Sequence, residues 1–220
     1  MNGSEESLQL PGIEMYAASN TSHQLPVLSK LERATHLKTH LPQMLSGHVQ
    51  GVFLQMLSHM IKPERILEIG TFTGYSAICL AQGLTKNGVL HTIDCNPEME
   101  EFALPFFAEA GLGNKIVMHI GDASQIISSM QGQFDIVFID ADKDNYIRYF
   151  DMVFPLVAEG GYILADNTLW YGRVVEPDAQ ANRETAPIVA FNEYVNQHTG
   201  VENVMLTIRD GITIARKKPV

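Results

Sequence analysis

The chain has 220 residues, of which 45% are hydrophobic and 18% are charged, and its formal net charge at pH 7 is −10. This length and composition fit one globular α/β or α+β domain and argue against a largely disordered chain. The negative charge disfavours DNA or RNA as the main partner, because an acidic surface repels the phosphate backbone.

The start of the sequence has neither the basic segment nor the apolar core of a signal peptide. No stretch approaches the roughly 20 apolar residues that a transmembrane helix needs. The two cysteines, Cys79 and Cys95, are too few for a disulfide framework. We therefore expect a soluble protein of the reducing cytoplasm, with no membrane partner.

The N-terminal part of the chain divides into a tail and a helical segment. Residues 1–25 are polar and irregular in pattern, and we interpret them as a flexible tail. Residues 26–62 are expected to form a helical cover. Within this cover, apolar residues from Val49 to Ile61 recur at the i, i+3, i+4 and i+7 positions of one helix face. Pro63 ends that helix, because proline cannot continue it.

From residue 65 onward, short apolar runs alternate with helical patterns. Strands are predicted at 65–69, 89–94, 116–120, 134–140, 162–165, 204–208 and 212–216. Helices are predicted at 74–83, 97–110, 124–130, 145–157 and 185–197. The turn Asp210-Gly211 separates the last two strands, which therefore form a hairpin-like pair. The alternation predicts an α/β fold: a seven-stranded, mainly parallel sheet with helices on both faces and one antiparallel strand near the edge.

A glycine-containing loop, from Glu68 to Ser76, follows the first predicted strand and opens a helix. Gly70 and Gly74 would let the backbone approach a ligand, and the helix start offers free N–H groups. The loop lacks the GxGxxG spacing of dinucleotide sites. Glu68 suits a ligand that carries an ammonium group better than it suits a pyrophosphate. The alternative is an ordinary strand-to-helix turn.

Asp94 ends the second predicted strand, at a position from which an acidic side chain often binds ribose hydroxyls. Taken alone, a strand-end aspartate is more often a helix cap, and here Asn96 or Asp94 could cap the helix that begins at Pro97. The glycine loop and the acidic residue together indicate a nucleoside-bearing cofactor.

Three oxygen-bearing side chains follow two later strands. Asp140 ends the run 134–140, and Asp166 and Asn167 end the next strand. If these strands are neighbours, two carboxylates and an amide oxygen meet at one rim, which suits a hard cation such as Mg²⁺. Taken singly, Asp140 could be a helix cap and the other two could form a turn.

Lys143 lies three residues after Asp140, at the mouth of the same predicted site. A lysine there could serve as a base for a reacting hydroxyl. The alternative is a solvated lysine in a turn that is rich in aspartate and lysine.

These motifs together resemble the cation-dependent class I S-adenosylmethionine O-methyltransferases of the caffeoyl-CoA and catechol O-methyltransferase type. The matching segments are EIGTFTGYS at 68–76, DADKDNY at 140–146, DNTLW at 166–170 and DGIT at 210–213. The resemblance runs from about Leu25 to the C-terminus. It implies a Rossmann-like class I methyltransferase fold, with residues 63–220 as the S-adenosylmethionine-binding catalytic domain, and a homodimer.

The resemblance also implies roles for individual residues. The methionine part of S-adenosylmethionine would be held by Ser46, Glu68, Gly70, Thr71 and Ser76. Asp94 would bind the ribose, Asp122 and Ala123 would frame the adenine, and Asp140 and Asp142 would also face the cofactor. The cation, Mg²⁺ or alternatively Mn²⁺ or Ca²⁺, would be held by Asp140, Asp166 and Asn167.

The same resemblance makes Lys143 the catalytic lysine, acting beside Asp140. Tyr171 stands where the plant enzymes have an asparagine that contacts substrate. The substrate position is therefore expected at Tyr171, but the plant substrate does not carry over to this chain.

We expect a divalent-cation-dependent transfer of a methyl group from S-adenosylmethionine to a hydroxyl of a catechol-like or hydroxycinnamoyl-like small molecule. A nicotinamide-dependent oxidoreductase would share the fold, but the GxGxxG motif is missing. A non-catalytic nucleoside-binding protein would share it too, without a need for Lys143 beside three oxygen ligands. An RNA methyltransferase is disfavoured by the negative charge.

Overall fold

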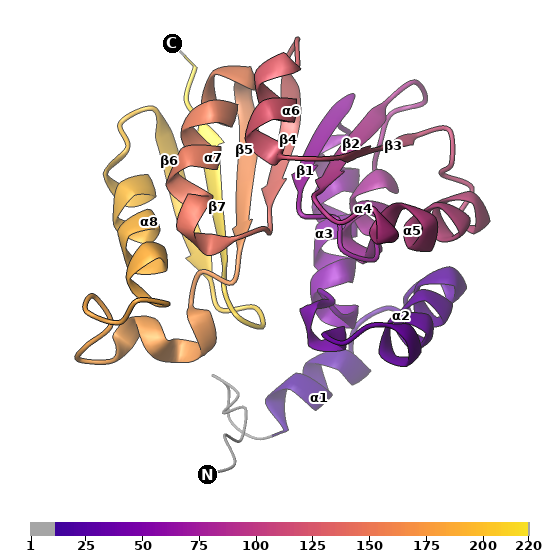
Figure 1. Ribbon diagram of the computed structural model, residues 1–220, viewed down its shortest axis with the longest axis horizontal. Coiled ribbons are helices and arrows are strands. Elements are labelled where there is room, and N and C mark those ends of the chain that lie inside the picture. Colours follow the sequence, from indigo (N-terminus) through magenta and orange to yellow (C-terminus); the bar gives the residue numbers. More distant parts are fainter. Residues whose placement is uncertain (1–11, 220) are drawn as a thin grey trace.

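The fold is a single seven-stranded sheet covered by helices, seen in a computed structural model that describes residues 12–219 (Figure 1). The strands are β1 (Arg65–Ile69), β2 (Val89–Asp94), β3 (Ile116–Ile120), β4 (Phe134–Ile139), β5 (Val157–Asp166), β6 (Val201–Leu206) and β7 (Ile212–Lys217). The α-helices are α1 (Ile13–Ser19), α2 (Pro26–Lys38), α3 (His48–Ile61), α4 (Tyr75–Ala81), α5 (Glu98–Glu109), α6 (Ala123–Ser129), α7 (Tyr146–Val153) and α8 (Ala186–Gln197). Short 3₁₀ turns are η1 (Pro42–Met44), η2 (Lys143–Asn145), η3 (Phe154–Leu156) and η4 (Trp170–Val175).

The strand order is β3-β2-β1-β4-β5-β7-β6. Strands β1 to β5 pair in parallel, and β7 is antiparallel to both of its neighbours, β5 and β6. The predicted mainly parallel sheet with one antiparallel strand near the edge is therefore confirmed. The order reverses between β1 and β4, and open α/β sheets form their ligand crevice at such a point.

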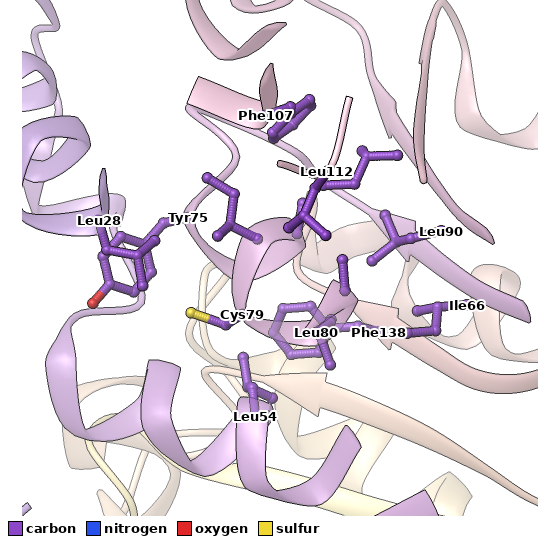
Figure 2. Close-up of a cluster of buried hydrophobic side chains, with 14 of the residues drawn as sticks. Leu28, Leu54, Ile66, Tyr75, Cys79, Leu80, Leu90, Phe107, Leu112 and Phe138 are labelled. Atoms are coloured by element: carbon purple, nitrogen blue, oxygen red, sulfur yellow. The ribbon is translucent and has the colours of Figure 1, made fainter. Parts of the chain in front are cut away.

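Two apolar layers hold the helices to the sheet, because successive residues of a strand point to opposite faces. Ile66 of β1 belongs to one apolar cluster with Leu90, Phe138 and buried residues of helices α2 to α5, several of which Figure 2 labels. Its neighbour Leu67 packs on the other face with Val137 and helices α6 to α8. Burial on both faces explains why the central strands are continuously apolar rather than alternating.

The N-terminal segment differs from the expectation. Residues 13–19 form helix α1, which lies against α3, so the expectation of an irregular segment is wrong for these residues. None of its side chains is buried, so the sequence carries no apolar stripe that would reveal the helix. Residues 1–11 of the predicted tail lie outside the described residues.

Strand β5 also differs from the expectation, because it begins at Val157 rather than at residue 162. Gly160 and Gly161 lie inside this strand, and the preceding helix stops at Val153 rather than at residue 157. Gly160 has φ 75°, and the pairing of β4 with β5 shifts register nearby. Glycine accommodates this irregularity inside the strand, and its turn-like signal misplaced the strand start.

None of the helices within residues 12–219 combines the length and apolar character needed to cross a bilayer.

Candidate active site

A cavity of about 1270 Å³ opens at the carboxyl ends of the parallel strands. Residues 38–46, between α2 and α3, form one of its walls, and the turns after β5 and β6 form another. All but two of the residues predicted from the sequence line it: Ser46, Gly70, Thr71, Ser76, Asp94, Asp122, Ala123, Asp140, Asp142, Lys143, Asn167 and Tyr171. The two exceptions, Glu68 and Asp166, lie beneath its surface.

The glycine loop lies in direct contact with the end of β4. Gly70 has φ 102°, and a Cβ atom there would lie 1.9 Å from the backbone oxygen of Asp140. The Gly70 N–H donates to Ile93 of β2, and the Asp140 N–H donates to Ile69 of β1. Only glycine allows this approach, which brings the glycine loop and Asp140 to one rim.

Asp94 ties two loops together rather than capping the helix after it. Its carboxylate accepts the Phe72 N–H at 2.7 Å and the Asn96 N–H at 2.9 Å. The side chain of Asn96 accepts the Glu98 N–H at the start of α5, which is the capping contact that Asp94 could have made. Asp94 is therefore held at the cavity wall by the glycine loop itself.

Asp122 has both a local structural role and a place in the cavity. Its side chain accepts the Gln125 N–H at 2.9 Å and so caps the N-terminus of α6. Ala123, the first residue of that helix, lines the cavity next to it. The cap fixes the direction in which α6 leaves the rim.

Glu68 is fully buried beneath the cavity floor and does not line it. The Thr92 hydroxyl donates to its carboxylate at 2.5 Å, and Thr92 in turn contacts the Thr71 hydroxyl at 2.5 Å. Burial raises the pKa of Glu68 to about 8, against the opposing effect of the Ser76 and Thr92 hydroxyls. Thr71 and Ser76, which belong to this hydrogen-bonded group, line the cavity above Glu68.

Lys143 joins the ends of β4 and β5. Its ammonium donates to Asn167 Oδ1 at 2.8 Å, to Asp140 Oδ1 at 3.1 Å and to the Tyr146 hydroxyl at 2.5 Å. The side chains of Lys143 and Asp140 are only 14% and 21% exposed. The alternative of a solvated surface lysine does not fit this arrangement.

Asp166 lies behind that cluster and is only 1% exposed. One carboxylate oxygen accepts the Asn167 N–H at 2.8 Å, and the other accepts the side-chain amide of Gln50 at 2.5 Å. Burial and the charge of Asp140 raise the pKa of Asp166 to about 7, whereas Lys143 and Gln50 oppose that shift. Two neighbouring acidic groups thus share a largely dry environment.

The donor set fits a hard cation by its chemistry. Asp140 and Asn167 already direct oxygen atoms toward one positive group, the Lys143 ammonium, and the Asp166 carboxyl lies next to them. Residues 12–219 contain no cluster of three His, Cys, Asp or Glu side chains arranged for a metal. The proposed set has only two carboxylates, and its third donor is an amide.

Residues 18–218 match the protein family described as O-methyltransferase. The chain belongs to the O-methyltransferase family. It is 37% identical over 179 residues to caffeoyl-CoA O-methyltransferase 2 of Zea mays, across 76% of this chain and 68% of that protein. The family assignment made from the sequence motifs is therefore confirmed.

Two solved structures illustrate the similarity of fold. The O-methyltransferase of Bacillus cereus in complex with SAH is 28% identical, with a TM-score of 0.85 over 94% of this chain and 97% of that one. The O-methyltransferase TomG of Streptomyces achromogenes in complex with SAM is 29% identical, with a TM-score of 0.83 over 94% and 96%. The predicted Rossmann-like methyltransferase fold is confirmed.

Three residues of this O-methyltransferase complete the site although sequence reasoning assigned them no role. Gln50 binds Asp166, as described above. The buried Tyr146 hydroxyl contacts Lys143 and donates to the backbone oxygen of Asp166 at 3.1 Å. Asp210 accepts the Tyr171 N–H at 2.5 Å. Tyr146 and Asp210 lie within the motifs at 140–146 and 210–213, so the resemblance could have pointed to them. Gln50 lies in the predicted helix from Val49 to Ile61, where the pattern indicated only an apolar face.

The wall of the cavity that carries Tyr171 has an unusual backbone. Asn167, Trp170 and Tyr171 have φ of 56°, 47° and 55°, in the left-handed region that non-glycine residues rarely adopt. The Tyr171 side chain is 55% exposed at the rim. Arg209, which also lines the cavity, donates to the backbone oxygens of Gln43 and Leu45 and so ties the two walls of the cavity together.

Proposed function

We propose that this O-methyltransferase moves a methyl group from S-adenosylmethionine to a hydroxyl of a catechol-like or hydroxycinnamoyl-like small molecule, with the help of a divalent cation. The observation that carries the proposal is the meeting of Asp140, Lys143 and Asn167 at the rim of the cavity that Gly70 and Asp94 line. One compartment thus offers groups for a nucleoside cofactor and groups for an oxygen-bearing substrate.

The cofactor assignment draws support from the SAM- and SAH-bound relatives and from the position of the predicted residues. Asp94 would bind the ribose hydroxyls, and Asp122 and Ala123 would frame the adenine. The methionine part would lie on the floor and walls formed by Ser46, Gly70, Thr71 and Ser76, with Asp142 facing it. Glu68 would act through the Thr71 and Ser76 hydroxyls that cover it. S-adenosylmethionine supplies the methyl group and leaves as S-adenosylhomocysteine.

The cation would be held by Asp140, Asp166 and Asn167, and Mg²⁺ suits this oxygen-only set. When bound, the cation supplies positive charge that acidifies a coordinated substrate hydroxyl. The positive charge of the cation would offset the repulsion between the Asp140 and Asp166 carboxylates. Such a site favours substrates with two adjacent oxygen atoms, as in catechols.

Lys143 would accept the proton of the reacting hydroxyl as its neutral amine, the form that the positive charge of a cation bound nearby would favour. Tyr146, Asp140 and Asn167 hold its amino group at the rim, so it needs little rearrangement to reach a hydroxyl there. The Lys143 ammonium nitrogen also lies over the Tyr146 ring, 4.6 Å from the ring centroid. These contacts place the proton acceptor beside the proposed cation ligands.

Apolar and aromatic side chains form the outer part of the cavity. Trp170 and Tyr171 stand on one wall, and Leu41 and Met44 stand on the wall formed by residues 38–46. Leu41, Met44 and Tyr171 are each more than half exposed. This combination suits a flat aromatic substrate whose ring lies between the walls and whose hydroxyls reach Lys143.

The test is a methyl-transfer screen over catechols, hydroxycinnamates and flavonoids, with Mg²⁺, Mn²⁺ or Ca²⁺ and with excess EDTA. We expect turnover with a vicinal diol, its loss in EDTA, and its recovery when Mg²⁺ is restored. Asp140→Asn should lose most of the activity while still binding S-adenosylhomocysteine. Full activity in EDTA would remove the cation from the proposal, and cofactor binding without turnover of any acceptor would favour a nucleoside-binding protein.

A further inference from the structure

Gln50 connects helix α3 to the end of strand β5. Its side-chain N–H donates to Asp166 Oδ2 at 2.5 Å, although 116 residues separate the two in the chain. Gln50 and Asp166 are each 1% exposed. The bond therefore lies in the interior, between the N-terminal helices and the sheet.

Packing does not account for an amide at this position. Among residues 12–219 the Gln50 carbonyl oxygen is buried without a hydrogen-bond partner, and an unpaired buried polar atom destabilises the fold. The other buried residues of α3 are Gly51, Leu54 and Ser58, and the Ser58 hydroxyl, unlike the Gln50 carbonyl oxygen, has a hydrogen-bond partner. A residue that carries such a cost in a core helix calls for a local role.

The hydrogen bonds around Asp166 show what that role is. Asp166 Oδ1 accepts the N–H of Asn167, and Asp166 Oδ2 accepts the amide of Gln50. Each carboxylate oxygen is thus held by one fixed donor and keeps another lone pair for a second partner. A carboxyl group held at both oxygens cannot rotate freely about its Cβ–Cγ bond.

We propose that Gln50 is a positioning residue that fixes the Asp166 carboxylate in the orientation used to hold the divalent cation. The inference rests on the proposed cation site. Carboxylates that bind metals are commonly oriented by such outer hydrogen bonds, whose removal costs roughly 10–100-fold in metal affinity or activity. Helix α3 thereby acts on the cation site as well as covering the sheet.

The test measures Mn²⁺ affinity by electron paramagnetic resonance, with the full-length protein and no substrate. Gln50→Met keeps the approximate shape of the side chain and removes the donor. We expect Mn²⁺ to bind about tenfold more weakly or worse, whereas the affinity for S-adenosylhomocysteine changes by less than twofold. A general loss of structure would lower both affinities, so this split distinguishes positioning from folding.

Ser58→Ala is the matched control on the same helix. The Ser58 hydroxyl is buried and donates to the backbone oxygen of Leu80 at 2.6 Å, remote from the cavity lining. This variant should lower the melting temperature without changing Mn²⁺ affinity. Gln50→Asn, which keeps the amide on a shorter side chain, provides a second variant and should weaken Mn²⁺ binding in the same direction.

Two results would overturn the inference. If Gln50→Met and Gln50→Asn bind Mn²⁺ within twofold of the wild type, Gln50 does not position the ligand, and the proposed cation site stands. If the wild-type protein itself binds no Mn²⁺, the cation site and the inference fail together.

Discussion

Lys143 Nζ lies 2.8 Å from Asn167 Oδ1, although 24 residues separate the two in the chain. The same ammonium is 3.1 Å from Asp140, so it stands among the oxygens proposed for the divalent cation. A cation bound to these oxygens and the charged Lys143 would repel each other, since both are positive and the Lys143 side chain is largely shielded from water. We therefore expect the cation and the Lys143 ammonium to compete for the same oxygen atoms.

Lys143→Met should therefore have opposite effects on catalysis and on metal binding. Turnover should fall by about 10²–10⁴-fold because the proton acceptor is lost. Mn²⁺ affinity should rise because a competing positive charge is removed. Lys62→Met, on an exposed residue at the end of α3, should change neither quantity. Unchanged Mn²⁺ affinity in Lys143→Met would show that the ammonium does not compete for these oxygens.

Glu68 should make the cofactor-free protein less stable as the pH rises. Burial raises its folded pKa from 4.5 to about 8, so the folded state holds the proton more tightly than the unfolded state. The resulting stabilisation is complete below pH 4.5 and is lost as the pH rises through about 8. Denaturant unfolding of the wild type and Glu68→Gln between pH 5 and 9 measures this difference. Parallel profiles for the two proteins would contradict it.

Gly70 should tolerate no side chain, in contrast to Gly111, which also has a positive φ but has free space around it. Gly70→Ala places a Cβ atom 1.9 Å from the backbone of Asp140, so the rim must open. We expect a loss of more than about 3 kcal/mol, from backbone strain and overpacking together, and loss of S-adenosylhomocysteine binding. Gly111 has φ 72°, but a Cβ atom there would have no neighbour within 4 Å among the described residues, so Gly111→Ala should cost about 1–2 kcal/mol without affecting binding. For both variants, chemical denaturation measures the free energy of unfolding, and titration calorimetry measures S-adenosylhomocysteine binding.

The pair His91 and His119 should reduce stability on the acid side. Their ring nitrogens lie 3.0 Å apart on β2 and β3, and partial burial lowers the pKa of both below 6.5. The unfolded chain therefore binds protons first, so the contribution present above pH 6.5 is lost as the pH falls through the lowered pKa values. Replacing both histidines by glutamine should flatten the pH profile of unfolding between pH 7.5 and 5. An unaltered profile would exclude this origin.

The sequence by itself determined which residues reach the rim. Parallel strands all end at one edge, so Asp94, Asp140 and Asn167 could be placed together once their strands were recognised. Gly70 was likewise placed in the loop that leads from β1 to helix α4. These conclusions depend only on period, strand ends and local turn chemistry.

Only the tertiary structure decided how deep each side chain lies and what holds it. Glu68 and Asp166 have the residue types of ligands, yet both lie beneath the cavity surface. The hydrogen bond from Gln50 to Asp166 depends on the rotation of α3 about its own axis against the sheet. The apolar periodicity of α3 does not predict that rotation to within one residue. Long-range hydrogen bonds depend on the packing of whole elements, and that packing is settled only when the complete core has formed.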